Sequence, residues 1–292
     1  MKKLLPLFFL GLFSKTTWSQ IIPNAAGVLF VKKGSTGNGS SWTNAVGELS
    51  DALKAANGSA TIQQVWVAAG VYLPGYKYPD NNQPATPGDR ENTFSISRSY
   101  KVYGHFAGTE QTTTERQLNN PAFSTVLSGD FNNNDRITSA STDISFAQVD
   151  ENAYTVLTIS ASMQYELDGF TITGGNCPAN LPPGAGMKIN FNARSVLSNL
   201  RITTNISARE GAAIHTNSGR LIMFNCFIAN NHSAQNGGGM YCINFTEASI
   251  NNTVFARNFG VEGAALYSKN GNISLINCTL VEKNGPSVFN AI

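Results

Sequence analysis

The stretch Gly211-Ala-Ala-Ile214 recurs at nearly constant intervals along the second half of the chain. Its copies are Ala185-Gly-Met187, Gly238-Gly-Met240 and Gly263-Ala-Ala-Leu266, and their last residues follow one another after 27, 26 and 26 residues. A second set, Asn199, Asn225, Asn251 and Asn277, recurs every 26 residues, and an apolar residue lies three positions after each member. A period of this length is typical of one supersecondary unit that stacks on copies of itself.

Each copy contains short apolar or β-branched runs separated by Gly and Asn, without the leucine ladders or paired helices of other repeat classes. The sequence therefore predicts an all-β fold, a right-handed parallel β-helix with about 26 residues per coil and equivalent residues about 4.8 Å apart. We expect the Asn set to lie at a sharp bend, where side-chain amides hydrogen-bond from coil to coil. The predicted interior comprises Met187, Ile202, Ile214, Ile228, Met240, Val254, Leu266 and Leu280.

The N-terminal part of the chain differs from the repeats. Residues 20–60 are predicted to form a strand over Val28–Val31 and a capping helix over Trp42–Ala56, where apolar residues follow helical spacing. Ser41 or Thr43 would begin this helix and Asn57-Gly58 would end it. The β-helix is expected over residues 61–292, with the clearest repeats over 160–292. Two loops, Pro74–Arg90 and Cys177–Pro183, should protrude from it.

Charge and composition restrict the class of protein. The 292 residues include 20 Lys and Arg against 18 Asp and Glu, and three of the basic residues lie in the first fifteen. The remainder carries no basic excess, so we expect no nucleic-acid partner. Residues 1–19 join a basic start to an apolar run too short to span a bilayer, which is typical of a signal peptide. The sequence predicts an exported protein, secreted or at the cell surface, without a transmembrane helix.

Four cysteines, Cys177, Cys226, Cys242 and Cys278, could form disulfides in an exported chain, in any of three pairings. Their spacing matches no zinc motif. Cys226 and Cys278 fall in one column of the repeat, but Asn252 would occupy the coil between them, so they would lie roughly 9–10 Å apart. We interpret both as structural thiols.

Several motifs resemble known families. Gly237-Gly-Gly-Met240, Glu262-Gly-Ala-Ala-Leu266 and Phe255-Ala-Arg-Asn258 resemble the repeats of chlamydial polymorphic outer-membrane proteins. Trp66-Val-Ala-Ala-Gly-Val-Tyr72, Tyr103-Gly-His-Phe-Ala-Gly-Thr-Glu110 and Leu167-Asp-Gly-Phe-Thr-Ile-Thr-Gly-Gly175 resemble secreted right-handed β-helix repeat proteins of Bacteroidetes-type bacteria. This resemblance implies an N-terminal helix that caps the solenoid and a surface or secreted location. Members of the group commonly end in a C-terminal sorting or anchoring domain, which is not found in this sequence. The sequence ends after Leu280 within less than half a period, so we expect a continuation or end-to-end self-association.

Catalysis is considered because β-helices include pectate lyases. A polysaccharide lyase needs carboxylates that hold Ca²⁺ and a basic Arg or Lys. The acidic residues of the repeat region do not recur in adjacent columns, apart from Glu210 and Glu262, which would lie two coils apart. The arginines lack a paired carboxylate cluster. The residues considered are Glu166, Asp168, Glu210, Glu247, Glu262 and Glu282 as acids, and Arg194, Arg201, Arg209 and Arg220 as bases.

One short segment resembles a calcium loop. Asp130, Asn132 and Asn134 place oxygen ligands at positions 1, 3 and 5, although Asp135 replaces the usual Gly and Ser141 the usual Glu. A plain Asn-rich turn is the alternative. The histidines, His105, His215 and His232, follow no ligand spacing, and no other cofactor is expected.

Two functions remain. The favoured hypothesis is a non-catalytic, adhesion-type scaffold at the cell surface that binds an extracellular polysaccharide or a host or matrix surface. The alternative is a carbohydrate-active enzyme of the pectate-lyase-like type.

Overall fold

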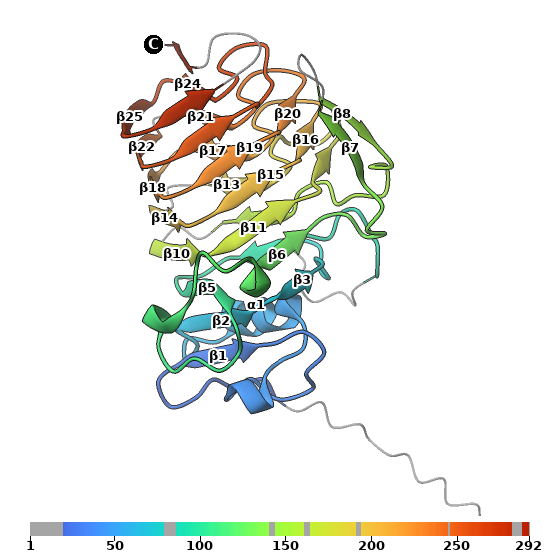
Figure 1. The fold of residues 1–292 in the computed structure, drawn as a ribbon, viewed down its shortest axis with the longest axis vertical. Coiled ribbons are helices and arrows are strands. Elements are labelled where there is room, and N and C mark those ends of the chain that lie inside the picture. The colour runs from blue at the N-terminus through green and yellow to red at the C-terminus, as the bar shows by residue number, and fades with distance from the viewer. Residues whose placement is uncertain are drawn as a thin grey trace, which may run out of the picture.

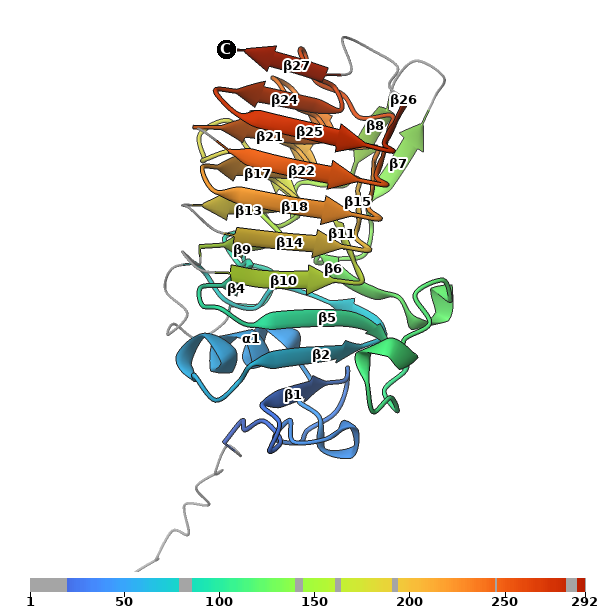
Figure 2. The same ribbon diagram turned by 90° about the vertical axis from the view of Figure 1, so that its left-hand side faces the viewer.

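The structure is a computed structural model that describes residues 20–78, 86–139, 144–160, 164–190, 194–244, 246–281 and 288–291. This part of the chain forms a parallel β-solenoid with about four regular turns of about 27 residues each. The predicted fold class is confirmed (Figures 1 and 2). The predicted signal peptide lies outside the described residues.

Three parallel sheets form the walls of the solenoid. The first has eight strands: β1 (Val28–Val31), β2 (Gln64–Ala68), β5 (Lys101–Phe106), β10 (Gln164–Asp168), β14 (Arg194–Ser198), β18 (Arg220–Phe224), β22 (Glu247–Asn251) and β25 (Asn272–Ile276). The second has seven: β3 (Gly70–Tyr72), β6 (Thr125–Ser128), β11 (Phe170–Thr173), β15 (Arg201–Thr203), β19 (Phe227–Ala229), β23 (Val254–Ala256) and β26 (Thr279–Val281). The third also has seven: β4 (Phe94–Ile96), β9 (Leu157–Ile159), β13 (Met187–Asn190), β17 (Ile214–Asn217), β21 (Met240–Ile243), β24 (Leu266–Lys269) and β27 (Val288–Ala291).

Smaller elements join these walls. A three-stranded parallel sheet lies between the second and third sheets in sequence and consists of β12 (Asn176–Cys177), β16 (Ile206–Ser207) and β20 (His232–Ser233). An antiparallel hairpin of β7 (Arg136–Ser139) and β8 (Ile144–Ala147) is inserted after β6. Three short 3-10 helices are η1 (Trp42–Asn44), η2 (Thr113–Glu115) and η3 (Pro121–Phe123).

The predicted capping helix is shorter than expected. The segment forms η1 and then, after Ala45–Glu48, the α-helix α1 (Leu49–Gly58). Ser41 does cap, but it accepts the Asn44 backbone N–H at η1 instead of beginning α1. Ala45 and Val46 lie in an extended segment, where Val46 forms a β-bridge with Val31. Both residues are apolar and fit the helical spacing by chance, so the predicted helix began too early.

Helix α1 nevertheless covers the core at the N-terminal end. It lies below β4, the terminal strand of the third sheet, and contacts that strand (Figure 2). Its buried residues Leu49, Ala52, Leu53 and Ala56 belong to the main hydrophobic core. The first sheet already begins with β1, which pairs in parallel with β2.

The apolar column that defined the repeat is confirmed. Met187, Ile214, Met240 and Leu266 pair with one another in successive strands of the third sheet, and each is at most 1% exposed. Ile202 and Ile228 pair in the second sheet and are fully buried. Leu280 is partly buried against the same core.

The prediction of Val254 as an interior residue is wrong. Ile228 pairs with Phe255, which is fully buried, whereas Val254 is half-buried and pairs with Phe227. The turn from β21 to β22 is one residue longer than the turn from β17 to β18, and this shifts the following strands by one position. Because side chains alternate between the two faces of a strand, a shift of one residue exchanges interior and exterior.

Because of the same one-residue shift, the predicted set of corner asparagines is wrong at one position. The residues with left-handed backbone at the corner between the first and second sheets are Asn199, Asn225, Asn252 and Asn277. Asn252 therefore replaces Asn251, and Thr253 replaces Asn252 as the residue between Cys226 and Cys278. Asn suits these corners because it tolerates positive φ.

The predicted amide ladder exists, but in a different column. Asn205, Asn231 and Asn258 are fully buried beyond the second sheet. The Nδ2 group of Asn205 donates to Oδ1 of Asn231 at 3.0 Å, and Nδ2 of Asn231 donates to Oδ1 of Asn258 at 2.9 Å. Backbone groups add to the ladder. Oδ1 of Asn231 also accepts the backbone N–H of Asn205, and Oδ1 of Asn258 accepts that of Asn231. Nδ2 of Asn205 and of Asn231 also donates to a carbonyl group of its own coil, so each of these amides joins its coil to the neighbouring ones.

The cysteines are all free thiols, and three of the four are buried. Cys226 and Cys278 occupy one column with Thr253 between them, in agreement with the expected separation by two coils. Burial raises the pKa of the Cys226 thiol to about 12, so this group is an unreactive part of the core.

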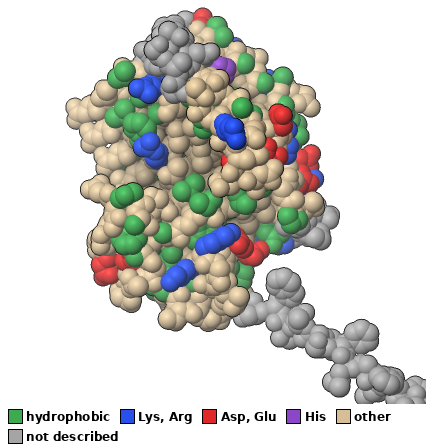
Figure 3. Space-filling view, turned by 45° about the vertical axis from the view of Figure 1, so that its right-hand side comes forward, with side chains coloured by type: hydrophobic (Ala, Val, Ile, Leu, Met, Phe, Trp, Pro, Cys, Tyr) green, Lys and Arg blue, Asp and Glu red, His purple; other side chains and the backbone are tan. Residues whose placement is uncertain are grey.

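The surface contains few charges. On the face shown in Figure 3, charged side chains are scattered among uncharged ones. Among the described residues, the helices are all too short or too polar to traverse a bilayer.

The amide ladder gives a direct test of the fold. Replacement of its central residue, Asn231→Ala, removes the two side-chain hydrogen bonds that join Asn205 to Asn258 through Asn231, together with the bond from Asn231 to the carbonyl group of Ile202, all in the buried interior. We expect the free energy of unfolding to fall by about 3 kcal/mol, measured by urea denaturation. The control is Asn225→Gly, at an exposed corner where glycine keeps the left-handed backbone, and it should change stability by less than about 1 kcal/mol. Equal losses in both variants would refute a role for the ladder.

Candidate functional site

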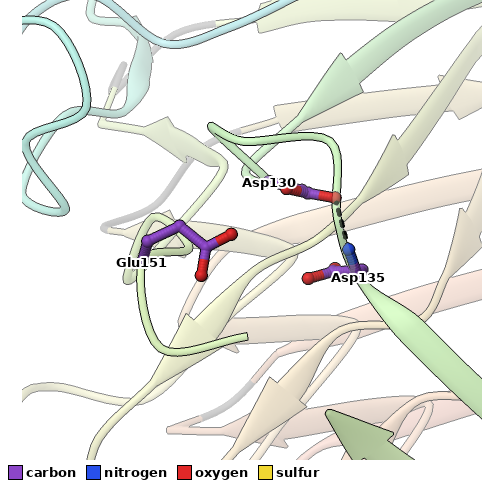
Figure 4. A group of neighbouring side chains, drawn as sticks. All are labelled: Asp130, Asp135 and Glu151. Carbon is purple, nitrogen blue, oxygen red and sulfur yellow. Dashed lines mark hydrogen bonds between the residues drawn. The ribbon is translucent and has the colours of Figure 1, made fainter. Parts of the chain in front are cut away.

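Three carboxylates gather at the base of the β7–β8 hairpin. Asp130 follows β6, Asp135 immediately precedes β7, and Glu151 follows β8. One oxygen of each lies within 4.8 Å of an oxygen of the other two, and Figure 4 shows the three side chains around a common space. The hairpin brings together residues that are up to 21 positions apart in the sequence. We call Asp130, Asp135 and Glu151 the carboxylate cluster.

Hydrogen bonds position two of these carboxylates. Asp130 accepts the backbone N–H of Asn134 at 3.2 Å through Oδ1 and that of Asp135 at 3.1 Å through Oδ2. The Nδ2 group of Asn152 donates to both oxygens of Asp135, at 3.1 and 3.0 Å. Burial, together with the negative charges of Asp130 and Glu151, raises the pKa of Asp135 to about 6 against the lowering effect of that amide.

Of the three predicted calcium ligands, only some lie at the carboxylate cluster. Asp130 belongs to the cluster, and Asn134 lies beside it through its backbone N–H. Asn132 is exposed. Sequence reasoning missed Asp135, Glu151 and Asn152, because it applied the spacing of a helix-flanked calcium loop. A usable signal was the alternation of Ile137-Thr138-Ser139 and Ile144-Ser145-Phe146, which indicates a hairpin that returns the chain to its start.

A cleft of about 430 Å³ lies above the outer face of the third sheet. This volume is within the range of small-ligand sites. One wall comes from the described parts of the predicted Pro74–Arg90 loop and its continuation, and another from the Cys177–Pro183 loop. We call it the third-sheet cleft; its lining residues are Lys77, Tyr78, Glu91, Thr93, Tyr154, Thr155, Thr158, Cys177, Leu181, Pro182, Lys188 and Asn190.

Lys188 is the distinctive residue of this cleft. It projects from β13 with its side chain away from the core, because its neighbours Met187 and Ile189 point inward. Burial lowers the pKa of the Lys188 ammonium, and the positive charge of Arg209 acts in the same direction. Among the described residues Lys188 forms no ion pair, whereas Lys77 pairs with Asp89 at 2.9 Å and Glu91 at 2.6 Å.

Lys188 belongs to a column of outward-facing side chains, in which Thr158 precedes it. It pairs with His215, which pairs with Tyr241, which pairs with Tyr267. The ring of His215 stacks on Tyr241 with centroids 5.5 Å apart, and Tyr241 stacks on Tyr267 at 5.0 Å. The signal for this column was present in the sequence, since each member directly follows a residue of the Met187 column.

The residues considered for a lyase do not assemble into one site. Asp168 is committed to a buried ion pair with Arg116 at 2.6 Å and also accepts from Ser198 and Asn199. Arg201 lies over the ring of Phe227, and Arg209 lies 3.6 Å from Glu210. Arg194, Arg220 and Glu247 share a column of the first sheet. Glu282 lies outside the described residues.

The other histidines occupy separate structural positions. His105 has a left-handed backbone, and its Nε2 lies 3.0 Å from the carbonyl oxygen of Asn120. His232 stacks on Phe259 and contacts the edge of Phe146 in the hairpin.

Comparison with known proteins gave no match to a protein-family model, a curated protein or a solved structure.

His215 provides a test of the electrostatics of the column. Burial, together with the positive charges of Lys188 and Arg209, lowers its pKa to about 4, whereas the unfolded value is about 6.5. Above pH 6.5 both states are neutral, but as the pH falls toward 4 only the unfolded chain binds the proton. The folded protein should therefore lose about 2 kcal/mol of stability between pH 7 and 4.5 through this residue.

The measurement is urea denaturation of the wild type and His215→Gln at both pH values. Other titrating groups, including Asp135, contribute to both proteins, so the difference between them isolates His215. The variant should lose about 2 kcal/mol less than the wild type over this range. An identical pH dependence in the two proteins would show that His215 titrates normally.

Proposed function

We propose that this protein is an exported, non-catalytic scaffold that binds an acidic polysaccharide of a cell surface or extracellular matrix in the third-sheet cleft. The solenoid supplies a rigid wall, and the two long loops supply the sides of the cleft. Loops on a rigid scaffold are where binding function concentrates. The export signal and a surface location belong to this proposal.

The observation that carries the proposal is the ammonium of Lys188. A half-buried cation without a counter-charge is costly, and a ligand that brings an anion removes this cost. Arg209 is close enough to lower the pKa of Lys188, so the positive potential extends beyond one residue. Among extracellular polymers, a polysaccharide with carboxylate groups, such as a polyuronate, supplies such an anion at each acidic sugar.

The remaining lining is suited to a sugar. Tyr78 and Tyr154 present aromatic surface, and Asn190 and Thr155 present polar groups that can hydrogen-bond to sugar hydroxyls. Asn190 lies two residues after Lys188 on β13 and therefore on the same face of the strand. A charged anchor, aromatic walls and hydrogen-bonding groups are thus present in one cleft.

A second cleft, of about 620 Å³, lies beside Trp42 and Trp66 near the N-terminal end of the solenoid. These rings pack against Phe30 and Phe106 and are only 9% and 6% exposed. A sugar that stacks on tryptophan needs an exposed ring face. We therefore place the polysaccharide in the third-sheet cleft.

A lyase is the second candidate, and the lowered pKa of Lys188 favours it. An amine with a lowered pKa is more often neutral and can abstract a proton next to a uronate carboxyl group. Arg209 would then help to neutralise that carboxyl group. This candidate uses the same cleft, so one set of variants tests both functions.

The test is calorimetric binding of oligogalacturonate, with a neutral cello-oligosaccharide for comparison. The wild type should bind the acidic ligand, and Lys188→Met should weaken that binding at least tenfold because the charge is lost while the stem is retained. The matched control is Lys269→Met, which removes an exposed lysine from β24 of the same sheet. This control should bind as the wild type does.

Absorbance of the unsaturated product, followed in the same samples with Ca²⁺ present, separates the two functions. No turnover is expected. Turnover that disappears in Lys188→Met would establish the lyase instead of the scaffold. Equal binding of acidic and neutral ligands, unchanged in Lys188→Met, would contradict both proposals.

A further inference from the structure

We propose that the carboxylate cluster, together with Asn152, is a Ca²⁺ site that joins the two ends of the β7–β8 hairpin. The inference is independent of the polysaccharide proposal, because it depends on different residues. It also differs from the loop that the sequence suggested, since Asp135 and Glu151 replace Asn132 as the main ligands.

The spacing of the oxygens suits calcium. Ca²⁺ binds oxygen at about 2.4 Å, so two ligands on opposite sides of the ion are about 4.8 Å apart. One oxygen from each carboxylate of the cluster falls within 4.8 Å of the other two. The three oxygens can therefore contact one ion without rearrangement of the backbone. All donors are hard oxygen atoms, which calcium prefers over nitrogen or sulfur.

A second observation points to a ligand at the same place. Three side-chain oxygens here are buried and accept no hydrogen bond: Oε1 of Glu151, Oδ1 of Asn134 and Oδ1 of Asn152. Asn152 is only 1% exposed, and its Nδ2 group donates to both oxygens of Asp135, so the amide ends at the cluster. A half-turn of this amide about its last side-chain bond exchanges Nδ2 for the unpartnered Oδ1 and presents an oxygen to the ion. Buried oxygens without donors are uncommon, and a cation satisfies several of them together.

The local charge leads to the same conclusion. Asp130, Asp135 and Glu151 form no ion pair among the described residues. Arg90, which is nearby, donates to the backbone carbonyl groups of Asn152 and Asn176 and not to the carboxylates. Three half-buried acids therefore repel one another without a counter-charge. A divalent cation would convert this repulsion into attraction.

The connectivity shows what the ion would do. Asp130 and Asp135 lie on the chain that enters the hairpin, and Glu151 lies on the chain that leaves it (Figure 4). An ion between them would join the two strands at their base. The segment after Glu151 leads directly to Tyr154 and Thr155, which line the third-sheet cleft. Calcium would therefore also fix the position of the segment that leads into one wall of that cleft.

The experiment compares the EDTA-treated protein with the same protein in CaCl₂ or MgCl₂, by calorimetric titration and by thermal unfolding. Ca²⁺ should bind with one-to-one stoichiometry and raise Tm by about 5 °C at a concentration 100-fold above Kd. Mg²⁺ should bind at least tenfold more weakly, because it requires a regular octahedral shell. Absence of a binding signal and of a Tm shift with Ca²⁺ would overturn the proposal.

Three variants make the test specific. Asp135→Asn should lose the Ca²⁺ response, yet in EDTA its Tm should stay close to that of the wild type, because the loss of one repelling charge offsets the loss of one of the two oxygens that accept from Asn152. Glu151→Gln should weaken Ca²⁺ binding at least tenfold. Asp150→Asn changes the neighbouring exposed acid and should respond to Ca²⁺ as the wild type does. A full Ca²⁺ response in Asp135→Asn or Glu151→Gln would refute this ligand set.

Discussion

The buried amide ladder of Asn205, Asn231 and Asn258 determines how neighbouring coils stack. Each amide joins its own coil to the coils beside it: Nδ2 of Asn231 donates to the carbonyl oxygen of Ala229 in its own coil and to Oδ1 of Asn258 in the next. A coil that is displaced by one residue would break the hydrogen bonds that cross between coils in the buried interior. The number of residues in a coil can still vary, provided that the extra residue lies in a turn between strands. The turn from β21 to β22 gains one residue, and the ladder remains continuous because the extra residue is accommodated before Asn258. Irregularity is thus restricted to the outward turns and loops.

Much of the architecture could be predicted from the sequence, because stacked coils impose one period on residues that are far apart. The Met187 column shows this, since its spacing follows the register of the third sheet. The detailed register could not be predicted where Asn251 and Asn252 are adjacent. Either asparagine fits a column at intervals near 26, and only the backbone distinguishes them. The start of α1 was missed because Ala45 and Val46 are apolar in an extended segment as well as in a helix.

The candidate sites were less predictable because they depend on departures from the repeat. The carboxylate cluster forms when the β7–β8 hairpin brings Glu151 back to Asp130 and Asp135, and no local motif records that return. The third-sheet cleft needs two loops from different coils, with Lys188 beneath them. Both features lie outside the regular coils. The repeat therefore provides the support, and the insertions provide the chemistry.

A structure of the protein in complex with an acidic oligosaccharide is the most direct test of the account. The account predicts that the ligand lies across the third sheet, with a sugar carboxylate at hydrogen-bonding distance, about 2.8 Å, from Nζ of Lys188. The stacked rings of His215 and Tyr241 should remain in place beside it, since the coils are rigid. A ligand bound along the first sheet, or beside Trp42 and Trp66 with the third-sheet cleft unoccupied, would contradict the assignment of function to this cleft.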